Sequence, residues 1–204
     1  MVNAVIMASG YSTRMGKNKL MLPFKGKPII EHVIDTIKEC NFNEVILVGR
    51  ENKVLDIGKK KNILTVLNTK AYKGQSQSIK LGILNTGASN GYMFFTGDQP
   101  LLDSYTINSL LNTFTRNNAY IIIPKYKDKV GSPTIFPKKL KNELLNLQGD
   151  VGGKAVINNH TNEILFVNLR NSCCLFDIDT SKDYEYILNK NLQQGCDNYD
   201  KQHI

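Results

Sequence analysis

Short apolar runs alternate with helix-like segments along most of this chain. The runs lie at residues 4–8, 44–49, 63–67, 92–96, 120–124 and 163–168, and residues 130–136 form a further extended stretch. Apolar runs of this length, bounded by turn residues, are typical of buried strands. We therefore predict a strand at each of them.

Between these runs, apolar residues recur with helical spacing. Residues 28–40 follow the i, i+3, i+4 pattern and open with a proline. Residues 103–114 begin with Asp103 or Ser104 as the predicted N-cap. Further helices are predicted at 76–84, 138–147, 151–159 and 181–189. The polar residues 190–204 are expected to form a flexible tail, so the predicted domain is 1–189.

Strand–helix alternation of this kind predicts an α/β fold, a three-layer Rossmann-like arrangement in which helices cover both faces of a mostly parallel sheet. In such sheets, ligands bind beyond the carboxyl ends of the strands. Segments that directly follow a predicted strand are therefore the first candidates for chemistry.

The composition indicates a globular protein. The chain has 204 residues, of which 41% are hydrophobic and 22% charged. It contains no apolar run of membrane-spanning length, and its start lacks the pattern of a signal peptide. The cysteines Cys40, Cys173, Cys174 and Cys196 form no CxxC pair and no disulfide framework, and the three histidines are scattered. We expect a cytoplasmic protein with no membrane partner.

The positive charge of the chain is concentrated in two segments. The formal net charge is +8, but residues 14–27 and 125–141 each carry +5, so the remainder sums to −2. Local positive charge predicts an anionic partner such as a nucleotide or a phosphorylated cofactor. For 125–141, a solvated lysine-rich surface is favoured. A nucleic-acid partner is not expected, because no recognition helix or RNA-binding motif is present.

A basic, glycine-containing segment follows the first predicted strand and reads ASGYSTRMGKNK from Ala8 to Lys19. Gly10 and Gly16 allow the backbone to turn and approach a ligand, and successive N–H groups can bind an anion. Arg14 and Lys19 add groups suited to phosphate oxygens. The spacing matches neither the P-loop nor the dinucleotide fingerprint. The residues alone leave a phosphate site and an ordinary basic turn as alternatives.

Carboxylates follow two of the predicted extended segments. Asp98 stands just past the strand 92–96, where a single carboxylate suits Mg²⁺, an ion that also takes phosphate and water ligands. A turn or cap role is the alternative. Asp177 and Asp179 alternate across an extended stretch, so one of them is expected to complete the metal site. The other is expected to belong to a helix start around Thr180.

Amide and hydroxyl side chains gather at the start of the helix predicted from residue 76. Gln75, Ser76 and Ser78 could read the edge of a nucleobase there, because the first turn of a helix also offers free N–H groups. The alternative is an ordinary serine cap.

Taken in order, these segments match one family. The sequence resembles the nucleotidyltransferases of the MobA/MocA type. The LAAGxSxRMGxxKLLLP-like signature of that family is IMASGYSTRMGKNKLMLP here, GQSxSLxxGL is GQSQSIKLGI, GDQPLL is unchanged and DIDTPED is DIDTSKD. PKYKDKVGSPTIF resembles PxYxGxxGHP, with Ser132 in place of the frequent His, and GDVGGK resembles GDxGxR.

The resemblance implies a glycosyltransferase-A-like fold and a reaction. KLMLP, GQSxS and DIDT are most similar to the molybdenum cofactor cytidylyltransferase branch. That branch implies transfer of CMP from CTP to the phosphate of molybdopterin or the molybdenum cofactor, with release of pyrophosphate. A molybdenum hydroxylase is the implied receiver of the product. The alternatives are GTP or another NTP as donor, a sugar or polyol phosphate as acceptor, and a non-catalytic cofactor-delivery protein.

The resemblance also implies roles for individual residues. Arg14 and Lys19 would be catalytic, and Asp98 with Asp179 would hold Mg²⁺ or Mn²⁺. The implied nucleotide-binding residues are Ala8, Ser9, Gly10, Gly16, Gln75, Ser76 and Ser78. The implied acceptor-side residues are Asp150, Gly152 and Gly153.

Overall fold

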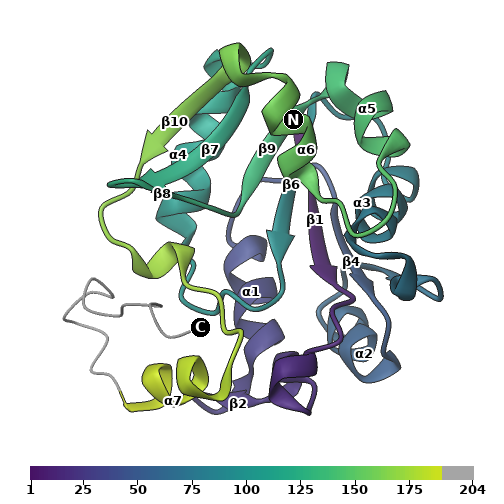
Figure 1. The fold of residues 1–204 in the computed structure, drawn as a ribbon, viewed down its shortest axis with the longest axis vertical. Coiled ribbons are helices and arrows are strands. Elements are labelled where there is room, and N and C mark those ends of the chain that lie inside the picture. Colours follow the sequence, from purple (N-terminus) through teal and green to yellow (C-terminus); the bar gives the residue numbers. More distant parts are fainter. Residues whose placement is uncertain (190–204) are drawn as a thin grey trace.

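One mixed sheet forms the centre of the molecule in the computed structural model, which describes residues 1–189 (Figure 1). Its strands lie in the order β10-β7-β9-β6-β1-β4-β5, and the short β8 pairs with β7. The strands of this sheet are β1 Val2–Ala8, β4 Val45–Gly49, β5 Leu64–Leu67, β6 Gly91–Thr96, β7 Ile121–Tyr126, β8 Lys129–Val130, β9 Thr134–Pro137 and β10 Ile164–Asn168. A separate small sheet pairs β2 Pro23–Phe24 with β3 Lys27–Pro28.

The strand directions bring several carboxyl ends to one edge. β1 is parallel to both of its neighbours, β4 and β6, and β4 is parallel to β5. β9 runs antiparallel to β6 and to β7, so β6 and β7 point the same way. The prediction of a mostly parallel sheet is thus confirmed, with β9 and β8 as the strands that run against it.

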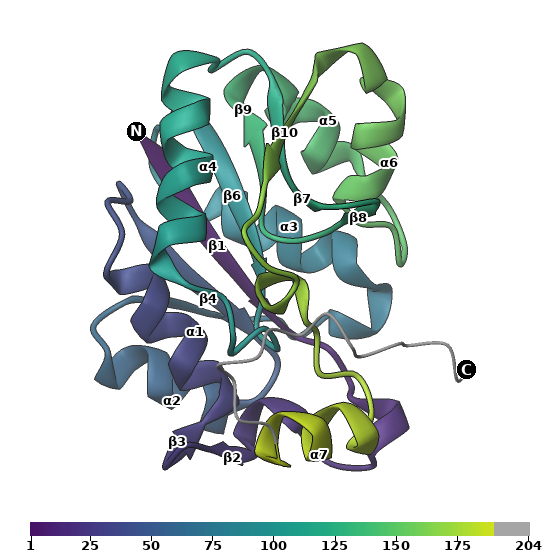
Figure 2. The same cartoon turned by 90° about the vertical axis from the view of Figure 1, so that its left-hand side faces the viewer.

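Helices cover both faces of the sheet (Figures 1 and 2). Apolar residues of α1, α2 and α4 share one core cluster with the sheet, whereas those of α3, α5 and α6 share the other. The helices are α1 Ile29–Lys38, α2 Asn52–Lys60, α3 Gln75–Leu84, α4 Ser104–Arg116, α5 Lys141–Asn146, α6 Gly153–Asn159 and α7 Ser181–Asn189. The short 3₁₀ helices are η1 Thr13–Met15, η2 Lys19–Met21, η3 Ala71–Lys73, η4 Lys138–Leu140, η5 Thr161–Glu163 and η6 Cys173–Leu175.

The strand alternation of β1 explains how both layers attach to it. Ala4 and Ile6 face one core cluster, and Val5 faces the other. On the Val5 side, α3 packs against the strand through Gly82, where an added Cβ would lie 2.3 Å from Val5 Cγ1. Each fully buried aliphatic side chain in these layers contributes roughly 1.5–3 kcal/mol relative to leaving it exposed.

A third apolar cluster, apart from the two that lie on the faces of the sheet, holds residues 176–179 in place. Met15, Phe24, Ile29, Phe176 and Ile178 pack together with Ile187 of α7. The cluster joins α7 to the region of β2 (Figure 2), and Tyr184 Oη donates to the carbonyl of Pro23 over 2.6 Å. Residues 176–179, which are far from β1 and β6 in sequence, are therefore fixed beside the carboxyl edge of the sheet.

Most predicted elements are present, and the differences have physical reasons. The helix α2 was not predicted, because only Val54, Leu55 and Gly58 of its nine residues are buried and the rest are largely polar or charged. The predicted helix at 138–147 divides into η4 and α5, and the extended stretch at 130–136 divides between β8 and β9. The predicted flexible tail, 190–204, lies outside the described residues.

The structure also shows the state of the cysteines and whether any described helix could span a membrane. Cys173 is disulfide-bonded, which the sequence did not predict, because the four cysteines show no pattern of a disulfide framework. Cys40 and Cys174 carry free, buried thiols. In residues 1–189, no helix combines the length and apolar character that crossing a membrane requires.

Candidate functional site

A cleft of about 910 Å³ opens beside the carboxyl ends of β1 and β6. Its walls come from the loop after β1, from Lys19, from η3 and the first turns of α3, from residues 96–98 and from residues 148–150. This is the edge at which the strand order predicts a ligand. Segments separated by more than a hundred residues thus line one cleft.

The loop after β1 presents backbone N–H groups without partners. Within residues 1–189, the N–H groups of Gly10, Tyr11 and Ser12 make no hydrogen bond. An added Cβ at Gly10 would meet no heavy atom within 4 Å, so the backbone is open to the cleft there. Ser12 adopts a left-handed conformation with φ 52°, and its carbonyl accepts from Met15 N over 3.0 Å. Successive free N–H groups in such a turn form an anion-binding concavity.

Two residues that follow β4 hold this loop at both ends. Arg50 Nε donates to the Gly10 carbonyl over 3.3 Å, and its guanidinium lies 4.5 Å from the centre of the Tyr11 ring. Glu51 pairs with Arg50 at 2.6 Å and accepts from Asn18 Nδ2 at 2.6 Å. We call Arg50, Glu51 and Asn18 the loop clamp. Sequence reasoning missed it, although charged residues directly after a strand were a usable signal.

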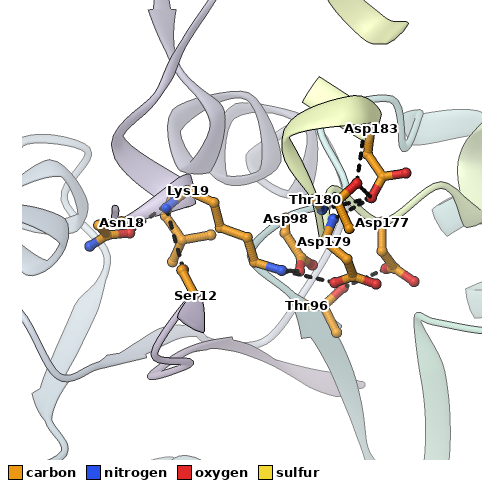
Figure 3. A network of polar contacts seen from close by, with 10 residues as sticks. Ser12, Asn18, Lys19, Thr96, Asp98, Asp177, Asp179, Thr180 and Asp183 are labelled. Atoms are coloured by element: carbon orange, nitrogen blue, oxygen red, sulfur yellow. Dashed lines mark hydrogen bonds and ion pairs between the residues drawn. The ribbon is translucent and has the colours of Figure 1, made fainter. Parts of the chain in front are cut away.

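Lys19 joins two carboxylates from distant parts of the chain (Figure 3). Its Nζ lies 2.5 Å from Asp98 Oδ2 and 3.0 Å from Asp179 Oδ1. Burial alone would lower the pKa of the Lys19 ammonium, but Asp98 and then Asp179 together more than offset it, so the pKa is raised. Lys19 is therefore a cation at neutral pH.

Asp98 has one oxygen left for another ligand. Its Oδ1 is buried and has no hydrogen-bond partner in the part of the chain that the structure describes. A buried acceptor without a partner is costly, so such an atom points to a missing ligand. No group of three or more His, Cys, Asp or Glu side chains within 1–189 could hold a metal ion. Carboxylate oxygens such as those of Asp98 are ligands that hard ions like Mg²⁺ and Mn²⁺ take together with phosphate oxygens and water.

Asp177 and Asp179, which the sequence left as alternatives for the second metal ligand, have different neighbours in the structure. Asp179 contacts Lys19, whereas Asp177 Oδ1 lies 3.5 Å from Thr96 Oγ1 (Figure 3). Asp183 accepts from the N–H groups of Asp179 and Thr180 over 2.9 and 2.8 Å, and Thr180 Oγ1 accepts from Asp183 N. The helix start predicted around Thr180 is present as this reciprocal cap, which fixes the backbone of Asp179. The expectation that the second aspartate would take part in it is wrong, because Asp183 supplies the capping carboxylate and Asp177 contacts Thr96.

The start of α3 forms another wall of the cleft. Gln75 and Ser78 line the cleft together with Ala8 and Ser9. The buried Asn68 donates to Ser9 Oγ and to Ser78 Oγ, both over 3.2 Å, and so joins the loop to the helix. Sequence reasoning missed Asn68, because a single asparagine after a strand carries no distinctive pattern.

Several of the predicted site residues lie elsewhere than the cleft surface. Ser76 is fully buried, its hydroxyl donates to the Gly149 carbonyl over 2.8 Å, and it does not line the cleft. Arg14 is exposed and Gly16 ends η1 with φ 64°, and neither lines the cleft. The structure thus separates these three residues from the open surface of the site.

The predicted acceptor-side residues lie against the start of α3. Asp150 lines the cleft and accepts from Gln75 N over 3.1 Å. Gly152 packs against the Gln75 side chain, since an added Cβ would lie 2.1 Å from Gln75 Oε1. Gly153 begins α6 and packs against the Phe136 ring. Only Asp150 of the three faces the cleft.

Comparison with known proteins gives a family match over most of the chain. The model of the MobA-like NTP transferase domain matches residues 4–164. A probable molybdenum cofactor guanylyltransferase of Natranaerobius thermophilus is 36% identical over 126 residues, which cover 60% of each chain. The purine catabolism protein PucB of Bacillus subtilis is 27% identical over 196 residues, covering 90% of this chain and 94% of PucB.

A solved structure supports the fold independently. Rv0371C of Mycobacterium tuberculosis H37Rv, in complex with manganese, superimposes with a TM-score of 0.78 at 21% identity and covers 92% of this chain and 97% of its own. At this level of identity the likeness concerns the fold alone.

Proposed function

We propose that this chain, which belongs to the family of MobA-like NTP transferase domains, transfers the nucleotidyl group of a nucleoside triphosphate to a phosphorylated acceptor and releases pyrophosphate. One observation carries the proposal. A single cleft brings together the cationic Lys19, N–H groups of the loop that have no partner within residues 1–189, and the buried Asp98, one oxygen of which also has no partner there.

Nucleotidyl transfer requires the protein to align the two substrates and to neutralise negative charge on the phosphates. An oxygen of the acceptor phosphate attacks the α-phosphorus, and the bond from that phosphorus to pyrophosphate breaks. Such transfers need little covalent help from the protein. The N–H groups of Gly10, Tyr11 and Ser12 donate to phosphate oxygens, and Lys19 stabilises charge on the α-phosphate and the leaving pyrophosphate. Arg14 is exposed and lies outside the cleft lining, so its proposed role requires its side chain to reach the phosphates when the nucleotide binds.

Asp98 and Asp179 are the residues that would hold a divalent cation. When bound, Mg²⁺ or Mn²⁺ neutralises negative charge on the phosphate oxygens. The unpaired Asp98 Oδ1 supports this assignment, as does the manganese complex of Rv0371C, which shares the fold. Gln75 and Ser78 are proposed for the base. Asp150 is proposed for the acceptor side, with Gly152 and Gly153 as supporting backbone.

The finer proposal is CTP as donor and molybdopterin or the molybdenum cofactor as acceptor, with a molybdenum hydroxylase receiving the product. It is supported by the KLMLP, GQSQS and DIDT segments. A second candidate is GMP transfer from GTP, which the name of the Natranaerobius relative favours. The match spans 60% of the length of that relative, so its activity enters here only as a proposal.

Nucleotide choice is tested by pyrophosphate release from purified protein with molybdopterin and Mg²⁺. We expect kcat/KM with CTP to exceed that with GTP by at least about tenfold, a difference of roughly 1.4 kcal/mol in transition-state binding. Release with GTP but not CTP would establish the second candidate instead. Release only with a sugar or polyol phosphate would replace the acceptor. Binding of CTP without release from any pair would favour a delivery protein.

Loss of the loop clamp is expected to weaken nucleotide binding more than turnover. Glu51→Ala removes the partner of both Arg50 and Asn18, so both ends of the loop gain freedom. We expect KM for the nucleotide to rise about three- to tenfold while kcat changes less than about twofold, because Glu51 positions the loop and does not touch the cleft. Steady-state kinetics measures both. The control is Glu39→Ala, an exposed glutamate at the end of α1. Equal effects of the two variants would contradict the clamp.

A further inference from the structure

The proposed metal ligands already share a cation, the ammonium group of Lys19. Nζ lies within 3.0 Å of an oxygen of each carboxylate, and Figure 3 shows the Lys19 side chain pointing toward Asp98 and Asp179. The Lys19 and Asp98 side chains are only 14% and 13% exposed, so solvent screens this pair weakly. An ammonium group at such distances occupies the lone pairs that a divalent cation would need.

Lys19 and a divalent cation cannot both bind Asp98 Oδ2 and Asp179 Oδ1 at the same time. Both carry positive charge, and a metal ion on Asp98 Oδ2 and Asp179 Oδ1 would stand in direct contact with Nζ, where like charges repel strongly. The unpaired Asp98 Oδ1 offers one oxygen that Lys19 does not use. A metal ion that uses Asp98 Oδ2 and Asp179 Oδ1 therefore requires the ammonium to leave.

Phosphate oxygens bound at the loop would give the Lys19 ammonium a second position. Its backbone is fixed, because its N–H donates to Ser12 Oγ over 3.3 Å and the next residue, Leu20, is buried in the core. The four-carbon stem is flexible, so the ammonium can move while the backbone stays. The loop from Gly10 to Ser12, with its unpartnered N–H groups, lines the same cleft.

We propose that Lys19 is an exchangeable cation that occupies the metal site until a nucleotide draws its ammonium to the phosphates. Nucleotide and divalent cation then bind with positive coupling, since the ligand that withdraws Lys19 also removes a positive charge from Asp98 Oδ2 and Asp179 Oδ1. The free protein is thereby kept from binding metal tightly without substrate. The proposal rests on the proposed function in one respect, that Asp98 and Asp179 form the cation site.

The test is a titration of the nucleotide-free protein with Mn²⁺, in which electron paramagnetic resonance counts the free ion. Lys19→Met removes the charge but keeps most of the stem, and we expect it to bind Mn²⁺ at least about tenfold more tightly than wild type. Lys19→Arg retains a cation and is expected to bind as weakly as wild type. Lys73→Met is the matched control, because Lys73 lines the same cleft without contacting either aspartate. It should stay within about twofold of wild type.

A second readout checks the folded state and the identity of the site. Mn²⁺ should raise the thermal midpoint of Lys19→Met more than that of wild type, since the metal replaces the lost partner of two carboxylates. Adding Asp98→Asn to Lys19→Met should abolish the tight binding. Tight binding that survives in this double variant overturns the proposal.

The remaining outcomes distinguish failure of the exchange proposal from failure of the proposed metal site. Measurable but equal Mn²⁺ affinity in wild type and Lys19→Met refutes the exchange and leaves the metal site standing. Equal tightening in Lys19→Met and Lys73→Met also refutes it, because general charge then explains the effect. No Mn²⁺ binding in any variant, Lys19→Met included, refutes the metal site itself and with it that part of the proposed function.

Discussion

Asp98→Asn is expected to lower kcat by about a thousandfold or more, a loss of roughly 4 kcal/mol of transition-state stabilisation. The amide cannot replace a carboxylate as a ligand for a hard cation, and it also removes the partner that lies nearest to Lys19. Because the substitution acts on charge neutralisation at the reacting phosphates, saturating concentrations of nucleotide and Mg²⁺ should not restore turnover. Pyrophosphate release at saturation measures the effect.

The fold should survive this substitution. Asn has nearly the same shape as Asp, and Lys19 keeps Asp179 as a partner, so we expect the free energy of unfolding to change by about 1–2 kcal/mol. Asp103→Asn is the matched control. Asp103 caps α4 by accepting from Thr106 N over 2.7 Å, and Asn caps helices about as well as Asp. Turnover of Asp98→Asn within about tenfold of wild type would remove Asp98 from the proposed mechanism.

The part of the site that sequence reasoning located depends on local patterns. The strands 4–8 and 92–96 were recognisable as apolar runs, and the rule that ligands bind at carboxyl ends then selected the loop after β1 and Asp98. The cap at Thr180 was visible for the same reason, since its partner Asp183 is only three residues away. Each of these features is encoded within a short stretch of chain.

The features that escaped prediction depend on tertiary contacts. Lys19 meets Asp179 across 160 positions, and no local pattern states that an ammonium will stand between these carboxylates. Asn68 has no distinctive sequence pattern around it. It can donate to Ser9 and Ser78 only because β5 ends beside the loop after β1 and beside α3. That Asp179 and not Asp177 is paired with Lys19 in the ion pairs described above likewise depends on how the 176–179 segment packs in the apolar cluster around Phe24 and Ile178.

Gly74 forms another tertiary contact, because it lies directly against the backbone of residues 149–150 at the start of α3. It precedes α3 with φ 91° and ψ −176°, a conformation that residues with a Cβ rarely adopt. An added Cβ would lie 2.4 Å from Asp150 Cα and 2.6 Å from the Gly149 carbonyl carbon. The same segment is held by Gln75 N on Asp150 and by Ser76 Oγ on Gly149. A side chain at Gly74 therefore has to displace backbone, because no flexible side chain can give way.

Gly74→Ala is expected to destabilise the fold by about 3 kcal/mol or more and to raise KM for the nucleotide, because strain and the clash with the 149–150 backbone act together. Gly16→Ala separates the two causes. Gly16 has φ 64°, but an added Cβ there meets nothing within 4 Å, so only strain of about 1–2 kcal/mol is expected. Urea unfolding of both variants gives the two free energies. If Gly74→Ala lowers the free energy of unfolding no more than Gly16→Ala does, the 149–150 backbone moves aside without cost. That result would contradict the inference, drawn from its hydrogen bonds to α3, that this segment is a rigid wall of the cleft.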